Sequence, residues 1–350
     1  MSDSAQGAVP FVSVIIPTRN EGRFISACLD SVLNGDYPLN RLEFVIVDAL
    51  STDGTRELIR QRISDAVPLR VLDDRERNIP RALNAAIRAA RGSFLVRLDA
   101  HNIYAEDYIR RCVERLVRGE ADMVGGVWHV VPRTNGAWGR AVAAVLTEPF
   151  GVGNAHYRTR KLTEPTLVDT VPYFACGREF FDRFGLYDDD IPGSEDMVYN
   201  LRVRKRGGRI LLDPEIQSWY HARTELKAFV RHNLRNGFWA VLPLAWGVRF
   251  RARHFTPLVF VAAITVLSAT WLFQGRFGWM LAVVLGTYLA AATFVSLRTA
   301  VRQRAPLQLV LMPLAFAVLH VFYGIGSLAG LGALAFKMLR SKAERSTAAA

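Results

Sequence analysis

The last third of the chain is almost continuously apolar, and this feature constrains the fold more than any other. The stretches 255–273, 277–297 and 307–336 are each long enough to cross a bilayer as a helix, which takes about 20 apolar residues. Their hydrophobicity is continuous rather than confined to one helical face, which argues against helices buried in a globular core. The sequence therefore predicts a transmembrane region at 255–336, after a soluble α/β part at 1–254.

Basic residues gather beside these stretches and account for much of the net charge of +12. They precede the first stretch and follow the second and third, at Arg249, Arg251, Arg253, Arg298, Arg302, Arg304, Lys337, Arg340, Lys342 and Arg345. Basic flanks mark the cytoplasmic side of a membrane and attract anionic headgroups. Membrane lipids are thus expected partners. Nucleic acid is not, because no interleaved aromatic and basic motif accompanies the charge.

The third stretch leaves the membrane topology open. The first two form an expected hairpin with an outer turn at 274–276. If the third also crosses, the basic tail 337–350 lies outside, against the positive-inside tendency. Its glycine-rich part, 323–330, could instead allow a break, a re-entrant path or an interfacial helix.

The soluble part is expected to remain in the cytoplasm. Residues 1–10 are small and polar without the apolar core of a secretory signal, and we expect a flexible N-terminus there. The cysteines Cys28, Cys112 and Cys176 fit neither a metal motif nor an even set of disulfides, so reduced structural thiols are expected. Residues 241–254 are expected to be a basic linker at the membrane interface.

Between 11 and 240, β-branched runs alternate with stretches of helical periodicity. Strands are predicted at 12–16, 44–47, 69–72, 94–98 and 123–131, and helices at 21–33, 56–63, 80–91 and 197–204. This alternation is typical of a parallel, right-handed α/β sheet. Residues 133–170 are expected to be long and irregular. Their basic side chains Arg158, Arg160 and Lys161 could face a phosphorylated or lipid-bound substrate, or belong to a solvated basic loop.

Three groups of polar side chains follow the predicted strands. Asp48 ends the second strand, and Asp53 lies five residues later; Asp99 and His101 follow the fourth; Glu195 and Asp196 precede a helix. Ligands of open α/β sheets bind beyond the carboxyl ends of the strands. Asp99 and His101 are donors that suit Mg²⁺ or Mn²⁺. The alternatives are structural, since such carboxylates also cap helices and stabilise helix amino termini.

The order and spacing of these groups resemble the family 2 glycosyltransferases, inverting enzymes of the GT-A fold. The resemblance extends from Val12 to about Trp239. Val12–Glu21 and Val47–Thr55 are similar to the family's two nucleotide-binding segments. Asp99-Ala100-His101 stands in place of its Asp-x-Asp motif, in a form that resembles bacterial exopolysaccharide, succinoglycan-type membrane glycosyltransferases. The implied fold class is α/β: a GT-A, Rossmann-like domain with a mostly parallel sheet, followed by C-terminal transmembrane helices.

The resemblance also implies roles for individual residues. Asp196 would be the general base, and Glu195 would hold the acceptor or the base. Asp99 and His101 would bind Mg²⁺ or Mn²⁺ bridging the donor diphosphate. Ala49 stands where the family commonly has a second acidic residue, which leaves the base specificity open. The donor nucleotide would be bound by Pro17, Arg19, Glu21, Asp48, Asp53 and Asp99, although for Asp53 shaping the turn is the favoured interpretation.

On the acceptor or diphosphate side, the resemblance implies Gly177, His221, Arg235 and Trp239. A simple turn at Gly177 and a packed, hydrogen-bonded His221 are the structural alternatives. Residues 232–239 stand in place of the Gln-x-x-Arg-Trp motif of processive synthases. The changed spacing and the few following spans favour the addition of one sugar per acceptor.

These features predict a metal-dependent inverting hexosyltransferase, multi-pass in the bacterial inner membrane, with its catalytic domain in the cytoplasm. It would move one sugar, from a UDP-hexose, to a polyprenyl-diphosphate-linked saccharide in exopolysaccharide or capsule synthesis. Two alternatives remain. One is a polyprenyl-phosphate sugar synthase, and the other is a non-catalytic membrane scaffold that binds a nucleotide sugar.

Overall fold

The computed structural model describes residues 9–153, 155–159 and 162–348, with side chains up to residue 340. Most of the predicted flexible N-terminus, and both Arg160 and Lys161, lie outside the described residues. The chain divides into two compact units, which are described separately. The first comprises Met1–His129 with His156–Tyr220, and the second comprises Val130–Ala155 with His221–Ala350. The predicted boundaries at 240 and 255 remain predictions.

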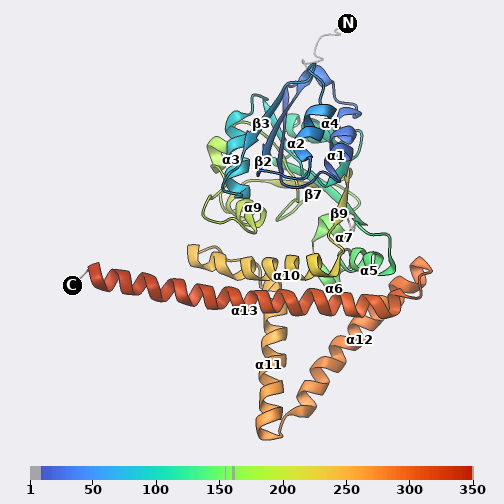
Figure 1. Cartoon of the computed structure of the whole chain (residues 1–350), viewed down its shortest axis with the longest axis vertical. Coiled ribbons are helices and arrows are strands. Elements are labelled where there is room, and N and C mark those ends of the chain that lie inside the picture. Colours follow the sequence, from blue (N-terminus) through green and yellow to red (C-terminus); the bar gives the residue numbers. More distant parts are fainter. Residues whose placement is uncertain (1–8, 154, 160–161, 349–350) are drawn as a thin grey trace. The chain divides into compact units, whose positions relative to one another are not determined.

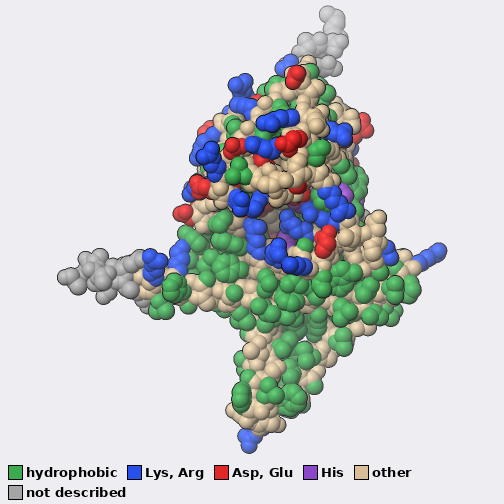
Figure 2. Space-filling view, in the orientation of Figure 1, with side chains coloured by type: hydrophobic (Ala, Val, Ile, Leu, Met, Phe, Trp, Pro, Cys, Tyr) green, Lys and Arg blue, Asp and Glu red, His purple; other side chains and the backbone are tan. Residues whose placement is uncertain are grey.

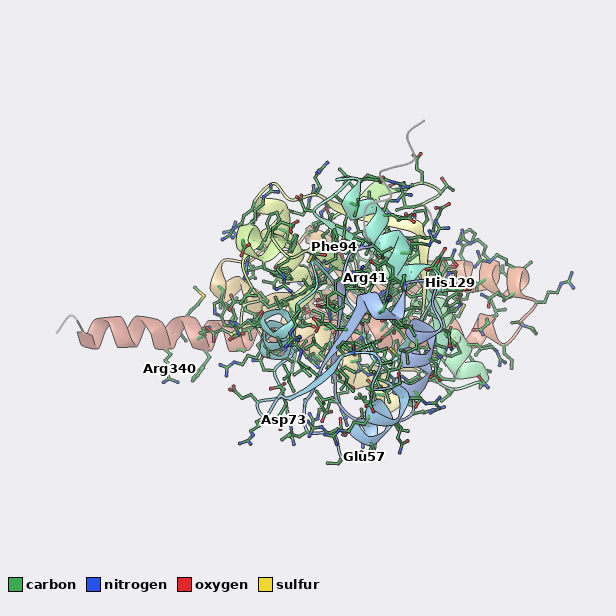
Figure 3. The ribbon with its side chains drawn as sticks, turned by 90° about the horizontal axis from the view of Figure 1, so that it is seen from above. Arg41, Glu57, Asp73, Phe94, His129 and Arg340 are labelled. Carbon is green, nitrogen blue, oxygen red and sulfur yellow. The ribbon has the colours of Figure 1, made fainter. Side chains whose placement is uncertain are left out.

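A mixed sheet of nine strands forms the centre of the first unit, in the order β3-β2-β1-β4-β8-β6-β9-β5, with β7 paired to β9. The first four of these strands pair in parallel, and β8 runs antiparallel to β4. In Figure 3, Asp73 marks the end of β3 and Phe94 the start of β4. The strands are β1 Val12–Thr18, β2 Leu42–Asp48, β3 Leu69–Asp73, β4 Phe94–Arg97, β5 Asn102–Tyr104, β6 Met123–Pro132, β7 Thr166–Leu167, β8 Ala175–Gly177 and β9 Ile210–Ala222.

Helices cover both faces of the parallel strands, which explains why those strands are mostly apolar. On one face α1 packs against α2, and on the other α3 packs against β1 and β2 (Figure 1). Ile15 and Val45 belong to the buried cluster that includes α3, so by alternation Val14 and Phe44 point to the opposite face. These helices are α1 Ile25–Leu33, α2 Thr55–Arg62, α3 Ile79–Ala89 and α4 Tyr108–Val117, with the short helix η1 Leu39–Arg41 before β2.

Two further helices, α8 Phe180–Phe184 and α9 Glu195–Lys205, join the same cluster as α3. Phe184 and Tyr199 are each 1 % exposed there, and burying a side chain of this size stabilises the fold by about 1.5–3 kcal/mol. Tyr199 stacks on Tyr187, with 4.1 Å between ring centroids. These contacts hold the first turn of α9, which carries Glu195 and Asp196, in a fixed position on the first unit.

The stretch expected to be irregular, 133–170, contains three helices among its described residues, so that prediction was wrong in part. It contains α5 Ala137–Val145, α6 Pro149–Val152, α7 His156–Thr159 and the short strand β7. The small residues Ala141–Val145 of α5 are buried, and α5 packs on α13 within the second unit. The helix therefore depends on a partner about 170 residues later, which local periodicity could not reveal.

The remaining elements of the second unit are helical: α10 Leu226–Val241, η2 Leu242–Trp246, η3 Ala252–Phe255, α11 Thr256–Gln274, α12 Gly278–Gln303 and α13 Gln308–Ala348. By length and composition, Ala252–Gln274, Gly278–Gln303 and Gln308–Arg340 are each apolar enough to cross a membrane. Figure 2 shows the hydrophobic surface over these helices. No break interrupts α13 at 323–330.

Candidate active site

The loops that follow β1 and β2 are tied together by hydrogen bonds from one to the other. The Asn20 N–H donates to Ser51 Oγ at 2.8 Å, and the Gly22 N–H donates to Asp53 Oδ2 at 2.9 Å. A Cβ on Gly22 would lie 2.7 Å from the Asp53 carbonyl oxygen, so only glycine fits here. Burial raises the pKa of Asp53, but hydrogen bonds from Thr55 and Gly22 outweigh it and hold the pKa below its usual range.

Asp48 is fully buried beneath these loops. Its carboxylate accepts from the Ser51 N–H at 3.0 Å and from the Ser51 hydroxyl, and Arg56 Nε lies 3.1 Å from Oδ2. Arg56 also pairs with Asp73, the residue beside Asp48 in the register of β2 and β3. Asp48 therefore organises its loop. Its predicted contact with the nucleotide remains a prediction, as does the contact of Pro17 in β1 and of the exposed Arg19.

Asp99 follows β4 and stands two residues before His101, which pairs with Glu21. Arg97 Nη2 lies 3.4 Å from Asp99 Oδ1, and no other described side chain forms an ion pair or hydrogen bond with that carboxylate. His101 Nδ1 lies 3.2 Å from Glu21 Oε1. This carboxylate orients the imidazole, so a metal or phosphate contact would use Nε2. The structure thus brings together His101 and Glu21, two side chains predicted separately at two strand ends.

Arg97 connects Asp99 to Asp196. Its guanidinium forms an ion pair with the Asp196 carboxylate through Nη1 and contacts Asp99 through Nη2. The Arg97 side chain is 4 % exposed, whereas that of Asp196 is 30 % exposed. Burial lowers the pKa of Arg97, but the charges of Asp196 and Asp99 outweigh burial. The net pKa lies above its usual range, and the side chain stays charged. The predicted base and the predicted metal ligand therefore share one buried cation.

The surroundings of Asp196 suit a proton acceptor near neutral pH. Burial of the carboxyl group is the largest influence and raises its pKa to about 7, with smaller contributions from Glu195 and Asp99. Arg97 acts in the opposite direction and lowers the pKa. A general base works best when its pKa lies close to the operating pH.

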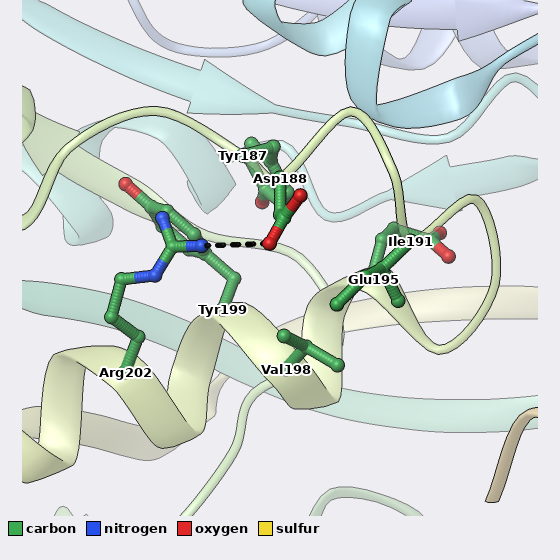
Figure 4. A pocket seen from close by; sticks show the side chains of 7 residues that line it. All are labelled: Tyr187, Asp188, Ile191, Glu195, Val198, Tyr199 and Arg202. Carbon is green, nitrogen blue, oxygen red and sulfur yellow. Dashed lines mark ion pairs between the residues drawn. The ribbon is translucent and has the colours of Figure 1, made fainter. Parts of the chain in front are cut away.

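Glu195 lies on a different side of α9 from the Arg97 pair. It lines a small hollow together with Tyr187, Asp188, Ile191, Val198, Tyr199 and Arg202 (Figure 4). Arg202 lies 3.9 Å from Asp188 across this hollow. Ser194, just before Glu195, has a left-handed backbone with φ of 56°, so the chain turns sharply into the helix. The predicted role of Glu195 near the acceptor or the base remains a prediction.

An aromatic cluster that sequence reasoning missed lies beside His101. The Tyr220 ring is 5.5 Å from His101 and stacks on Trp128 at 4.4 Å. The Arg158 guanidinium lies over Trp128 at 4.8 Å and over Tyr157 at 5.4 Å. The Nε of Arg158 and the Nε1 of Trp128 are buried without a hydrogen-bond partner among the described residues. Buried donors of this kind call for an acceptor.

Arg158 also lacks an ion pair with any acidic residue of the described chain. Cation–π contacts hold its guanidinium in place without neutralising the charge. The cluster therefore presents a fixed positive charge one aromatic ring away from His101, which suits an anionic group. The sequence signal was the basic run beginning at Arg158, but nothing local indicated that Trp128 and Tyr220 would receive it.

The structure does not bring Gly177 together with Asp99. Gly177 pairs with Phe94 at the start of β4, whereas Asp99 follows the end of that strand. Five residues of strand separate the two ends by about 16 Å. Within the predicted acceptor segment 173–178, it is Tyr173 that lies near the site, accepting a hydrogen bond from Asn102.

His221, Arg235 and Trp239 belong to the second unit. His221 follows Tyr220 in β9, so its side chain points to the opposite face of the strand from the aromatic cluster. Arg235 and Trp239 lie four residues apart on α10 and share one face of that helix. Their predicted contacts with the diphosphate or acceptor remain predictions.

Known proteins are similar to this chain in sequence and in fold. Residues 13–185 match the family described as glycosyl transferase family 2. The chain is 26 % identical over 333 residues to dolichyl N-acetyl-alpha-D-glucosaminyl phosphate 3-beta-D-2,3-diacetamido-2,3-dideoxy-beta-D-glucuronosyltransferase of Methanococcus voltae, covering 92 % of this chain and 97 % of that protein. It is 27 % identical over 330 residues to succinoglycan biosynthesis protein ExoA of Rhizobium meliloti (strain 1021), covering 89 % of this chain and 92 % of that protein.

A solved structure shares the fold over most of the chain. Mannosyltransferase PcManGT from Pyrobaculum calidifontis, in complex with GDP-Man and Mn²⁺, superposes with a TM-score of 0.57 at 22 % identity. The likeness covers 92 % of this chain and 87 % of that chain. The predicted GT-A domain followed by long apolar helices is confirmed. The sheet, however, is mixed and not mostly parallel, because β8 pairs antiparallel with β4 and β6, and β9 pairs antiparallel with β5 and β7.

The residues present could hold a divalent cation only if a substrate phosphate or water supplied the remaining ligands. Among the described residues, no three His, Cys, Asp or Glu side chains gather closely enough to hold a metal ion. Asp99 keeps 24 % of its side chain exposed, and His101 is oriented by Glu21. Two protein donors leave several positions of an octahedral ion to other oxygens, as is usual for Mg²⁺ bound with a phosphate.

Proposed function

Because residues 13–185 match the family described as glycosyl transferase family 2, we propose that this protein is an inverting, membrane-attached hexosyltransferase. It moves one sugar from a nucleotide sugar to a polyprenyl-linked saccharide. The observation that carries the proposal is the Arg97 bridge between Asp196 and Asp99. A base with a pKa of about 7 is thereby coupled to a carboxylate suited to a metal–diphosphate group.

The proposed reaction is a single displacement. Asp196 accepts the proton of the acceptor hydroxyl while that oxygen attacks the anomeric carbon. The bond from that carbon to the nucleoside diphosphate breaks at the same time, and the diphosphate leaves with the electron pair. Attack from the face opposite the leaving group inverts the anomeric configuration. Arg97 positions Asp196 and keeps the base close to the leaving-group side of the site.

Asp99 and His101 would hold Mg²⁺ or Mn²⁺, which would neutralise charge on the departing diphosphate. Glu21 fixes the orientation of His101 for this purpose. The linked loops after β1 and β2 would receive the nucleotide, with their backbone shape maintained by Asp48 and Asp53. Arg158, held over Trp128, would contact a phosphate of the donor or of the lipid-linked acceptor.

The nature of the acceptor rests on the relatives. The Methanococcus voltae relative is named for transfer to a dolichyl-phosphate-linked sugar, and the Rhizobium meliloti relative for succinoglycan biosynthesis. The first name supports a lipid-linked saccharide as the acceptor, and the second supports a role in polysaccharide synthesis. A UDP-hexose is the proposed donor and a polyprenyl diphosphate the proposed carrier. The proposed location is the inner membrane of a bacterium, with the catalytic domain in the cytoplasm and α11 and α12 crossing as a hairpin.

The full-length protein in membranes tests this proposal. UDP- and GDP-hexoses are supplied with Mn²⁺ or Mg²⁺ and one of three acceptors: a polyprenyl-diphosphate saccharide, a polyprenyl-phosphate saccharide, or plain polyprenyl phosphate. Nucleotide release that requires a lipid-linked saccharide is expected, with a product of inverted configuration. Release with plain polyprenyl phosphate alone would instead support the sugar synthase. Donor binding without release under any condition would support the scaffold.

A further inference from the structure

The long helix α13 runs alongside the polar helix α10 in the same direction. Gly326 of α13 lies against Leu234 of α10, and a Cβ on Gly330 would lie 2.6 Å from the Phe238 carbonyl oxygen. Farther along, Lys337 Nζ lies 3.3 Å from the centre of the Trp246 ring, just beyond α10. The contacts advance together along both helices, which lie side by side within the second unit (Figure 1).

This packing brings the two backbones into direct contact. A side chain on Gly237 would overlap the Tyr323 carbonyl. The hydroxyl of Ser327, which is fully buried, lies 3.1 Å from the Gly237 carbonyl oxygen. Small residues allow such close approach between helices. Because the contact is direct over several turns, the middle of α13 must lie at the same membrane depth as α10.

α10 is too polar for the hydrocarbon core. Lys227, Arg231 and Arg235 are exposed and spaced four residues apart, so they form one charged face. Each such charge at the bilayer centre costs about 2.5–3.5 kcal/mol even on the lower scale. A helix with this face belongs in the headgroup region, and it holds the middle of α13 there.

The contact of α13 with the start of α11 independently indicates the same shallow depth for the middle of α13. Gly324 is at the centre of the apolar stretch Gln308–Arg340, and a Cβ there would contact Val261 and overlap the Pro257 carbonyl. Pro257 lies in the first turn of α11, directly after the basic segment 249–253. A crossing helix would place Gly324 near the bilayer centre. The 33 residues of the stretch also span about 50 Å, against a hydrocarbon thickness of about 30 Å.

α13 has one face on the protein and the opposite face uncovered. Met312, Phe316 and Leu319 are buried, and they share the side of the helix that carries Gly326 and Gly330. At 3.6 residues per turn, the exposed apolar residues on the opposite side lie within about 60° of one another. They extend almost the length of the described helix: Val310, Leu314, Ile325, Leu328 and Leu339.

We propose that α13 does not cross the membrane but lies flat in its cytoplasmic interface, with this uncovered face inserted at the boundary between headgroups and acyl chains. The partner of this face is an anionic lipid leaflet. Exposed basic residues stand near both ends of the stripe, at Arg302, Arg304, Lys337 and Arg340, where they would bind headgroups. Only α11 and α12 then cross, and the basic tail stays on the cytoplasmic side. The inference rests on the proposed membrane attachment and not on catalysis.

The side on which the chain ends is the first test. A cysteine appended after Ala350 in the active, full-length protein is challenged in intact cells with a membrane-impermeant maleimide. Gln274→Cys at the end of α11 is the outer control, and Gln303→Cys at the end of α12 is the inner control. Cys28, Cys112 and Cys176 are buried, and their replacement by alanine removes any background. The appended cysteine is expected to react only after permeabilisation, like Gln303→Cys. Reaction in intact cells would overturn the proposal.

The depth of α13 is the second test. Nitroxide labels at Leu314→Cys, Leu328→Cys and Leu339→Cys are compared, in bilayers with anionic lipid, with a label at Leu285→Cys on α12. Collision rates with oxygen and with a nickel chelate report depth. The three α13 labels are expected at one shallow depth and the α12 label much deeper. A maximum of depth at Leu328 would show a crossing helix, and exclusion of both reagents would show coverage by a second protein chain. Either result overturns the proposal independently of activity.

Discussion

The two edges of the candidate site differ in how completely their polar groups are paired. In the loops after β1 and β2, Asp48 and Asp53 have several partners each, supplied by Ser51, Arg56, Thr55 and Gly22. Among the described residues, Thr18 Oγ1 and Arg56 Nε are buried there without a hydrogen bond, but Arg56 Nε still forms an ion pair with Asp48. On the other edge, Arg97 Nε, Asn102 Oδ1, Trp128 Nε1 and Arg158 Nε are all buried without one, among the described residues.

The first edge is preorganised by its own hydrogen bonds, whereas the hydrogen bonding of the second edge is incomplete without a ligand. The loops after β1 and β2 are held by their own hydrogen bonds, so their shape does not depend on a ligand. On the edge around Asp99, Asp196 and Arg158, several buried N–H donors have no hydrogen-bond partner among the described residues. These donors are available to bind a substrate. Changes on the second edge should therefore affect turnover or substrate binding, whereas changes on the first should affect local stability.

Asp196→Asn should have the largest effect. Loss of the base removes the proton acceptor, and the contribution of general base catalysis is about 10²–10⁴-fold in kcat. Donor affinity, followed by titration with the nucleotide sugar, should change little. Asp188→Asn, which alters a carboxylate paired with Arg202 near the same helix, is the matched control and should retain activity. Full turnover by Asp196→Asn would refute the assignment of the base.

Arg97→Met should reduce kcat by about 100-fold, because the base loses the cation that positions it. Breaking a buried ion pair costs about 3–5 kcal/mol, and less here because Asp196 is 30 % exposed. Arg97 lowers the pKa of Asp196, so its removal should also move the acid limb of the pH profile to higher pH. Arg97→Lys should restore part of the rate and of the pH position. An unshifted profile in Arg97→Met would show that the role is only structural.

The wild-type pH profile should fall on the acid side. Asp196 accepts a proton only when ionised, and its pKa is about 7, so kcat/KM should decline below that pH, tenfold per pH unit for one group. The decline should be absent from the binding of the donor measured over the same range. A rate that stays constant down to pH 5 would contradict the raised pKa.

Arg158→Gln should raise the KM for the phosphate-bearing substrate about 10-fold with a smaller change in kcat, since a charge-assisted hydrogen bond contributes about 1.5–3 kcal/mol. Trp128→Phe keeps an aromatic ring beneath the guanidinium but removes the indole N–H. It should therefore distinguish the support that Trp128 gives Arg158 from a direct contact of the indole N–H with the substrate. Comparing the KM for donor and for acceptor identifies which phosphate is bound. Unchanged KM values for both would exclude the contact.

Asp53→Ala should have the smallest effect on turnover and act on the loops. Losing its hydrogen bonds should destabilise them locally by about 1–2 kcal/mol. Amide hydrogen exchange at Gly22 and Thr55 should then become faster. The folded-state pKa of Asp53 is lowered, so this contribution is present above the unfolded-state pKa and disappears as the pH falls through the folded-state pKa. The difference from wild type should therefore vanish at low pH.

The strands were predictable where burial on both faces imposes a simple pattern. Val12–Ile16 is β-branched except at Ser13, and Phe44–Val47 is a continuous β-branched or aromatic run. They lie inside the observed β1 and β2. α5 was missed because its sequence is short, and its burial comes from a distant helix. Arg97 was overlooked within an apolar strand run. A charged residue in a central, doubly covered strand was itself the signal, because burying it requires a paired carboxylate.

By itself, the sequence determined the local elements, the strand ends that carry Asp48 and Asp99, and the apolar character of the last three helices. Each of these depends on neighbours within one or a few turns of chain. Only the tertiary structure decided that Arg97 meets Asp196, 99 residues away, that Arg158 rests on Trp128, and that α13 packs on α10. Periodicity shows which face of an element must be buried, but not which distant partner buries it, because that choice depends on how all the elements pack together.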